Sequence, residues 1–207
     1  MGLTAEHIAD GVSALSAIDA RFAEAAARYG LPEPRLRPRG YETLLRAIVS
    51  QQVSTAAAAS IWRKLEAQVG DLHDPARLIA VAPEELRAAG LSGMKASYAK
   101  SLAAHVADGS LPLDALPADD EEAIALLSSV RGLGRWSAEI YLLFAEGRPD
   151  VWPAGDLAVQ VEVGRLLGLD AKPSEKLLRD LAEPWRPYRG AAAVLAWHSY
   201  NSVGTAL

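Results

Sequence analysis

Apolar side chains recur along this chain at the spacing of an α-helix. Over residues 4–29, the residues Ile8, Val12, Leu15 and Ile18 follow one another at intervals of three or four positions, which places them on one helical face. The same period predicts further helices: two within 41–70, one each over 75–81 and 83–89, one within 90–109, and one each over 119–130, 135–145, 156–167, 173–182 and 187–201. No stretch convincingly alternates apolar with polar residues in the manner of a strand. The predicted fold class is therefore all-α.

Proline and polar capping residues mark where these helices begin and end. Residues 30–40 form a proline-rich connector that cannot be regular helix. The break near residues 51–54 offers Ser54 or Thr55 as the N-cap of the next helix, because their hydroxyl groups accept hydrogen bonds from backbone N–H groups. Asp156 likewise stands at the start of a predicted helix.

Two glycines one residue apart, Gly132 and Gly134, separate the helix over 119–130 from the next one. Such a turn can hold phosphate, because glycine adopts positive φ and the first N–H groups of the following helix have no partner within the helix. The letters GLGRWS approach the dinucleotide fingerprint G-x-G-x-x-G, with Asp156 downstream as a ribose-binding acid, but that motif needs a preceding strand. Here a helix is predicted instead. We therefore predict a helix-hairpin-helix that contacts a nucleic-acid backbone without reading its sequence; the residues alone leave an ordinary αα-hairpin as the alternative.

The overall charge bears on this prediction. The chain has 207 residues, 50% of them hydrophobic, and a formal net charge of −5. The acidic balance is mild evidence against nucleic-acid binding, since such domains are usually basic. Local cations matter more: Arg131 and Arg135 flank the glycine turn, and Arg148 lies downstream. With the backbone amides they can hold DNA phosphates on an acidic protein.

Several classes of protein are excluded by composition. The chain has no cysteine, so disulfides, thiolate metal sites and cysteine-ligated iron–sulfur clusters are ruled out. Its histidines show no metal-ligand spacing. No apolar run approaches the roughly 20 residues that span a bilayer, and the first residues lack the features of a signal peptide. We expect a cytoplasmic protein, associated with the nucleoid if it is bacterial, and no membrane partner.

Four segments of the chain occur in a characteristic order: AIVSQQVSTAAA, GLSGMKASYAKSLA, VRGLGRWSAEIYLLFAEGRPDVWPAGD and WRPYRGAAAVLAWH. Together they resemble the helix-hairpin-helix (HhH-GPD) DNA glycosylase superfamily, and within it the AlkA-type 3-methyladenine DNA glycosylases. The resemblance covers about residues 41–200, nearly the whole chain.

The resemblance implies two small helical domains that flank a cleft, with the hairpin at the mouth of the cleft. Residues 1–207 are expected to form one glycosylase unit. A central subdomain over 40–130 includes the wedge loop, and a second subdomain over 1–39 plus 131–207 carries the exit helix of the hairpin and the catalytic aspartate. AlkA has an additional N-terminal β-rich domain, which this chain is expected to lack.

The resemblance assigns the catalytic aspartate to Asp156. Cleavage of an N-glycosidic bond builds positive charge on the sugar, and a carboxylate in a partly dry pocket stabilises that charge and can orient a water molecule. Aspartate is also a favoured N-cap, so the residues alone favour a purely structural role. The two roles are compatible.

The hairpin of this family commonly binds a monovalent cation through backbone carbonyl groups. This implies a Na⁺ or K⁺ site at Ser128, Val130 and Leu133. No cofactor is expected to be required for the reaction.

Trp136 stands where strand-nicking relatives carry a lysine, whose amine forms a Schiff base with the sugar. The resemblance therefore implies a monofunctional enzyme, which hydrolyses the base with water and leaves an abasic site. An indole face also attracts a cationic ring, and N-alkylated purines carry a positive charge. The alternative for Trp136 is plain core packing.

Three further residues are assigned to the base pocket by their positions in the family pattern. Trp197 and His198 correspond to its C-terminal aromatic pair, with histidine in place of the tyrosine of the prototype. Ile140, one helical turn after Trp136, replaces an aromatic residue. Both departures affect the expected range of substrates.

The base must leave the duplex before it can be cleaved, and a side chain must fill the gap. The family wedge lies in the loop SQQVS, where Gln52 is the best candidate, with Gln51 and Val53 beside it. The alternative is an ordinary polar turn. Lys95, after the other glycine turn, can touch phosphate or lie on a solvated helix face.

We therefore predict a monofunctional DNA-3-methyladenine glycosylase II-type hydrolase of base excision repair. It would act as a monomer on double-stranded DNA that contains 3-methyladenine or 7-methylguanine. The DNA-binding set is Gln51, Gln52, Val53, Lys95, Arg131, Gly132, Gly134 and Arg135. One alternative is a glycosylase of the same fold for another damaged or mismatched base. The other is a non-catalytic, structure-specific DNA-binding protein.

Overall fold

The structure is a computed structural model that describes residues 2–204, and it divides into two compact units. One unit is Met1–Arg37 with Leu142–Leu207, and the other is Pro38–Tyr141. The described residues form helices and contain no strand, which confirms the predicted all-α fold. None of these helices combines the length and the apolar character that a membrane crossing requires.

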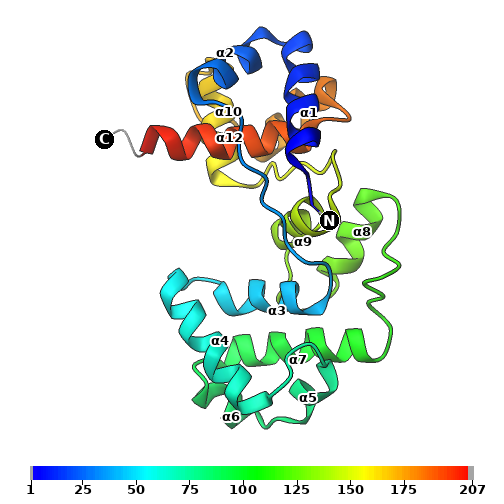
Figure 1. Ribbon diagram of the computed structural model, residues 1–207. Coiled ribbons are helices and arrows are strands. Elements are labelled where there is room, and N and C mark those ends of the chain that lie inside the picture. Colours follow the sequence, from blue (N-terminus) through cyan, green and yellow to red (C-terminus); the bar gives the residue numbers. More distant parts are fainter. Residues whose placement is uncertain (1, 205–207) are drawn as a thin grey trace. The chain divides into compact units, whose positions relative to one another are not determined.

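The unit Pro38–Tyr141 holds seven helices among its described residues: α3 (Tyr41–Ser50), α4 (Thr55–Val69), α5 (Pro75–Ala80), α6 (Pro83–Ala88), α7 (Gly93–Ala107), α8 (Asp120–Ser128) and α9 (Arg135–Tyr141). Helix α7 packs against α3, α5 and α6, and Figure 1 shows α3 and α7 running side by side. Ser54 and Ser92 cap α4 and α7 through their hydroxyl groups, so the predicted cap at residue 54 or 55 is Ser54.

The other unit contains α1 (Ala5–Ile18), α2 (Ala20–Tyr29), the π-helical segment η1 (Leu142–Glu146), α10 (Leu157–Leu166), α11 (Glu175–Leu181), the short 3₁₀ segment η2 (Glu183–Trp185) and α12 (Arg189–Gly204). Helix α12 packs against α1, α2 and α10. Phe22 and Trp152 both meet Trp185 edge to face, at ring centroid distances of 5.0 and 5.6 Å. These aromatic contacts lie in the core of this unit.

The predicted single helical stretch over 4–29 is wrong at one point. Asp19 adopts an extended conformation, with φ −146° and ψ 115°, and separates α1 from α2. Its carboxylate accepts a hydrogen bond from Arg21 N at 3.0 Å and binds the Arg21 guanidinium. The apolar period continues across the break, so the period alone did not reveal it. The helix predicted to end near residue 145 likewise changes to π geometry at Leu142.

The hairpin belongs with the unit Pro38–Tyr141, whereas the expected subdomain boundary lay at 130/131. Helix α9 packs against α8 and α3, and the Tyr141 hydroxyl accepts a hydrogen bond from Gly40 N at 2.8 Å. Residue 1 and residues 205–207, which the expected unit also includes, lie outside the described part of the chain.

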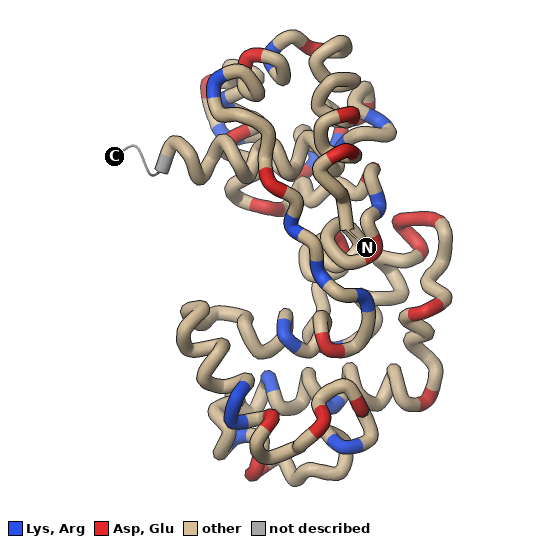
Figure 2. Tube along the Cα trace, in the orientation of Figure 1, with Lys and Arg blue, Asp and Glu red and all other residues tan. Residues whose placement is uncertain are grey.

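Basic and acidic residues are interspersed along the chain (Figure 2). Many arginines therefore pair with a carboxylate within one helical turn, as Arg46 does with Glu42 and Arg87 with Glu84. Exposed pairs of this kind contribute little to stability, but they neutralise positive charge. Arginines outside such pairs are the ones whose charge is available to a ligand.

Gly132 fixes the hairpin against α7. Its φ is +96°, and a Cβ atom at this position would lie 2.3 Å from Tyr98 Cγ. Only glycine combines the left-handed backbone with so close an approach of the Tyr98 ring. A Cβ atom on Gly134 would meet nothing within 4 Å, and its φ lies outside the left-handed region.

We expect Gly132→Ala to lower the free energy of unfolding by roughly 2–4 kcal/mol, because it adds a left-handed strain and an overpacking clash. Gly134→Ala is the matched control and should cost less than about 1 kcal/mol. Urea unfolding followed by circular dichroism measures both. Equal stability of the two variants would contradict this account of the hairpin.

Candidate functional site

Asp156 begins α10, and its carboxylate is held by two donors from different elements. Oδ1 accepts hydrogen bonds from Val159 N at 3.0 Å, the N-cap interaction, and from Trp197 Nε1 at 3.0 Å. Asp156 N donates to Pro153 O at 2.9 Å, which closes a turn before the helix. The residue is half-buried. A carboxylate fixed in this way is suited to facing a charge that develops nearby.

The sequence analysis assigned Trp197 to the base pocket. In the structure, its indole N–H donates a hydrogen bond to the Asp156 carboxylate. The side chain is 8% exposed and its ring lies 5.6 Å from that of Phe144, centroid to centroid. A buried indole N–H needs an acceptor, and Asp156 Oδ1 supplies it. Trp197 therefore orients the Asp156 carboxylate.

His198, the next residue of α12, ties this helix to the end of α2. Its Nε2 lies 2.8 Å from Tyr29 O. A backbone carbonyl can only accept a hydrogen bond, so Nε2 carries a proton in this arrangement. The imidazole is part-buried. His198 thus follows Trp197 in the sequence and is hydrogen-bonded to the last residue of α2.

The loop that leads to Asp156 is pinned by charged and aromatic side chains. Asp150 receives two hydrogen bonds from Arg189, Nε to Oδ1 and NH2 to Oδ2, each 2.8 Å long, and Arg186 also binds Oδ2 at 2.7 Å. Trp152 Nε1 donates to Leu178 O at 3.3 Å. This bidentate pairing and the buried indole restrict the approach of the loop to α10.

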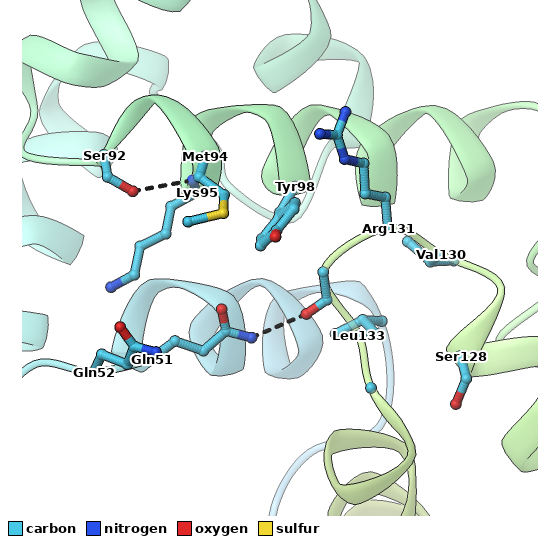
Figure 3. A pocket seen from close by; sticks show the side chains of 12 residues that line it. Gln51, Gln52, Ser92, Met94, Lys95, Tyr98, Ser128, Val130, Arg131 and Leu133 are labelled. Atoms are coloured by element: carbon cyan, nitrogen blue, oxygen red, sulfur yellow. Dashed lines mark hydrogen bonds between the residues drawn. The ribbon is translucent and has the colours of Figure 1, made fainter.

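Most of the predicted DNA-binding residues line one pocket in the unit Pro38–Tyr141 (Figure 3). Its volume is about 520 Å³. Nine expected residues contribute to its wall: Gln51, Gln52, Lys95, Ser128, Val130, Arg131, Gly132, Leu133 and Gly134. Ser92, Met94 and Tyr98 line it as well, and the sequence analysis did not assign them.

The loop after α3 is joined directly to the hairpin. Gln51 Nε2 donates to Gly132 O at 2.9 Å (Figure 3). Gln52 is exposed and has φ 53°, and it is the one described non-glycine residue with positive φ. Such a backbone is uncommon for glutamine and persists where the surroundings enforce it. Val53 follows and is 38% exposed, but it is not part of the pocket wall.

Lys95 and Arg131 are the cationic side chains of the pocket. Lys95 Nζ donates to Val49 O at 2.8 Å, and burial lowers the pKa of this amine. Arg131 is exposed, makes no ion pair with a described residue, and lies 5.9 Å from the centre of the Tyr98 ring. Both cations can interact with an anion that enters the pocket.

Arg135 differs from the expected phosphate ligand because two carboxylates hold its guanidinium. Its NH2 binds Glu121 Oε1 at 2.6 Å and its Nε binds Glu139 Oε1 at 2.9 Å. Hydrogen bonding to Glu121 raises the pKa of Arg135. The positive charge is already neutralised, and Arg135 is not among the residues that line the pocket.

Trp136 and Ile140 lie on α9, in a different unit from Asp156. Trp136 is 50% exposed, so core packing does not account for it. Ile140 is part-buried. A tryptophan with half of its surface accessible can contact another molecule.

The residues predicted to hold Na⁺ or K⁺ have oxygen atoms that differ in their hydrogen bonding. Val130 O accepts a hydrogen bond from Leu133 N at 3.0 Å, which leaves it a second lone pair. The Ser128 hydroxyl is buried and has no hydrogen-bond partner among the described residues. These oxygens are the donor type that hard cations take. Elsewhere in the described chain no group of three His, Asp or Glu side chains is placed to hold a metal ion.

Signals for the unassigned pocket residues were weak. Tyr98 lies one helical turn after Lys95, Ser92 is the N-cap of α7, and Met94 lies in the first turn of that helix. Helical spacing would have placed Tyr98 beside Lys95. Nothing local indicates that this face meets the hairpin, because that contact joins residues far apart in the chain.

Comparison with known proteins places the chain among DNA repair enzymes. Residues 45–187 match the HhH-GPD superfamily of base excision DNA repair proteins. Alkylbase DNA glycosidase-like protein mag2 of Schizosaccharomyces pombe is 31% identical over 192 residues, which cover 88% of this chain and 89% of mag2.

Two solved structures share the fold and about a third of the sequence. A DNA-3-methyladenine glycosidase from Bacillus halodurans superposes with a TM-score of 0.86 at 30% identity, over 94% of this chain and 91% of that one. The 3-methyladenine DNA glycosylase Mag1 of Schizosaccharomyces pombe, in complex with abasic DNA, gives 0.77 at 30% identity, over 91% and 95%.

The two hydrogen bonds on Asp156 Oδ1 predict different effects for two substitutions. Asp156→Asn keeps a carbonyl-type acceptor, so its free energy of unfolding should stay within about 0.5 kcal/mol of the unsubstituted protein. Asp156→Ala loses the cap and leaves the buried Trp197 N–H unpaired, at a cost of roughly 2–3 kcal/mol. Urea denaturation at neutral pH measures both, and equal destabilisation by the two substitutions would refute this assignment.

Proposed function

Because this chain belongs to the HhH-GPD superfamily of base excision DNA repair proteins, we propose that it is a monofunctional DNA glycosylase for alkylated bases. Its substrates would be 3-methyladenine and 7-methylguanine in duplex DNA, and its product an abasic site. The names of its relatives support the substrate class. The observation that carries the reaction is the fixed carboxylate of Asp156, held by α10 and Trp197.

In the proposed reaction the bond between the sugar C1′ and the base nitrogen breaks, and its electron pair leaves with the base. An N-alkylated purine that is cationic becomes neutral in this step, which makes it a good leaving group. Positive charge develops on the sugar, and the Asp156 carboxylate stabilises it electrostatically. A water molecule then forms the new bond to C1′ and loses a proton. The two donors on Oδ1 hold the carboxylate in one orientation during these changes.

The pocket beside the hairpin is the proposed contact with the DNA backbone. Lys95 and Arg131 supply positive charge there, Gly132 lets the hairpin pack on Tyr98, and Gly134 leaves the hairpin backbone accessible. Contacts of this type position the duplex without reading bases. They also reconcile DNA binding with a net charge of −5, because the charge that matters is local.

Gln52 is proposed as the residue that fills the gap left by the flipped base. It is exposed, and its left-handed backbone is braced by the neighbouring bond from Gln51 to Gly132. A glutamine amide can donate to and accept from the orphaned partner base. Val53 adds an exposed apolar side chain next to it.

Trp136 supports hydrolysis by water instead of a lyase mechanism. A Schiff base requires an amine, and this hairpin position carries an indole. We further propose that the exposed ring attracts cationic bases, and that His198 and Ile140 adjust the range of bases accepted. Ser128, Val130 and Leu133 would hold a structural Na⁺ or K⁺ through their backbone carbonyl oxygens.

Base release from methylated duplex DNA tests this function. The purified protein should release 3-methyladenine or 7-methylguanine, and Asp156→Asn should lower the single-turnover rate by about 100-fold or more because it removes the stabilising charge. Chromatography of the freed bases measures the rates. The folded Asp156→Asn variant should still bind abasic duplex, which separates chemistry from binding.

Three results would contradict the proposal. An Asp156→Asn variant as active as the unsubstituted protein would remove Asp156 from the mechanism. Binding of duplex DNA without release of any base, by both proteins, would favour a structure-specific binding protein. Release of oxidised or mismatched bases alone would assign the same fold to another lesion.

A further inference from the structure

We propose that Gln160 and Lys172 form a positioning pair that sets the backbone turn carrying Asp156. The inference rests on the proposed function, since it concerns the carboxylate assigned to the reaction. Neither side chain is a catalytic residue: both act through the turn at Ala154 and Asp156. Gln160 is one helical turn beyond Asp156 on α10, and Lys172 lies in the segment before α11.

Gln160 is bonded to this turn through both its backbone and its side chain. Gln160 N donates to Asp156 O at 2.9 Å, within the first turn of α10. Gln160 Nε2 donates to Ala154 O at 2.8 Å, and this is the one hydrogen bond that Ala154 O receives from a described residue. Gln160 is 7% exposed and Ala154 is fully buried. Loss of the amide would leave a buried carbonyl without a donor, which is costly enough to move the turn.

Lys172 holds the amide of Gln160 from the other end. Its Nζ lies 2.6 Å from Gln160 Oε1. An ammonium group can only donate, so the amide oxygen must face Lys172 and the NH₂ group must face Ala154 O. The Ala154 carbonyl, which can only accept, requires the same orientation, so the two partners hold the amide group from both ends. The exposed ammonium group thus reinforces a buried hydrogen bond.

Gly164 allows the segment that carries Lys172 to reach α10. A Cβ atom on Gly164 would lie 2.8 Å from Pro173 Cδ and 3.8 Å from Ala171 O. The chain on either side of Lys172 therefore packs directly on α10, one turn beyond Gln160. The same segment leads into α11, whose Arg179 donates to Trp152 O at 3.4 Å. The segment around Lys172 and helix α11 therefore both contact the part of the chain that surrounds the turn.

The physical consequence concerns rate more than affinity. A displacement of the turn would move the Asp156 carboxylate relative to the sugar, and misplacement by about 1 Å can reduce a rate by a factor of roughly 100. Binding of the DNA backbone is assigned to the other unit of the chain and would be unaffected. A positioning role therefore predicts a lower single-turnover rate at saturating enzyme with unchanged affinity for abasic duplex.

The test compares Lys172→Met, Lys172→Arg and Gln160→Met in single-turnover base release. Lys172→Met should lower the rate about tenfold and Gln160→Met roughly 10–100-fold, while Lys172→Arg, which keeps a donor, should recover most of the rate. The double variant Gln160→Met/Lys172→Met should be no slower than Gln160→Met alone, because the lysine acts through the glutamine. Lys176→Met, the same change four positions along, is the matched control and should leave the rate unchanged.

The outcomes separate this inference from the proposed function. Absence of base release from the unsubstituted protein would overturn the proposed function. Normal release that Asp156→Asn abolishes, together with a Lys172→Met rate equal to that of Lys176→Met, would overturn the positioning role alone. Additive effects in the double variant, or a fall in abasic-DNA affinity that accounts for the loss, would also overturn it. Lys172 is on the surface, so its variants give an answer even where Gln160→Met fails to fold.

Discussion

The hydrogen bonds that converge on Asp156 Oδ1 organise the unit that carries the proposed chemistry. One comes from the first turn of α10 and the other from a buried indole on α12, so the position of the carboxylate depends on how these two helices pack. Two further features restrict the position of Asp156. The loop before it is held by Arg189 and Asp150, and the segment around Lys172 packs on Gly164. A carboxylate that faces a developing cation must be placed before the reaction begins, because reorganisation during the reaction would consume the electrostatic gain. The N-cap and the proposed catalytic group are thus one residue with two compatible roles.

In the proposed function, the unit Pro38–Tyr141 has a different task, which is to hold phosphate on a chain with a net charge of −5. Arginines next to carboxylates are neutralised, as Arg135 is by Glu121 and Glu139. What remains for DNA is a small set of cations around exposed hairpin backbone, with Tyr98 packed so closely on Gly132 that the turn has one position. The bond from Gln51 to Gly132 links that turn to the loop proposed to enter the duplex. The proposed backbone contact and the proposed wedge loop are therefore linked directly within one unit.

Sequence reasoning succeeded where the governing interactions are local. The helical period, the serine cap at Ser54 and the capping role of Asp156 depend on residues within four positions of one another, and the structure confirms each of them. It failed at Asp19, where a local carboxylate interrupts an unbroken apolar period. It also could not anticipate contacts between distant positions: Trp197 with Asp156 across 41 residues, or Tyr98 with the hairpin. The resemblance to a family supplied residue roles, but only the packing reveals that Arg135 is already paired and that Gln160 is bonded to the turn that carries Asp156.

The central claim is that the Asp156 carboxylate stabilises positive charge on the sugar. The most direct measurement compares the affinity for duplex DNA containing a cationic pyrrolidine in place of the sugar ring with that for a neutral tetrahydrofuran at the same site. The unsubstituted protein should bind the cationic duplex about 100-fold more tightly or better, as expected for a mimic of the charged transition state. Asp156→Asn should bring the ratio of the two affinities close to unity while leaving the tetrahydrofuran affinity unchanged. An undiminished preference for the cationic duplex in that variant would contradict the account.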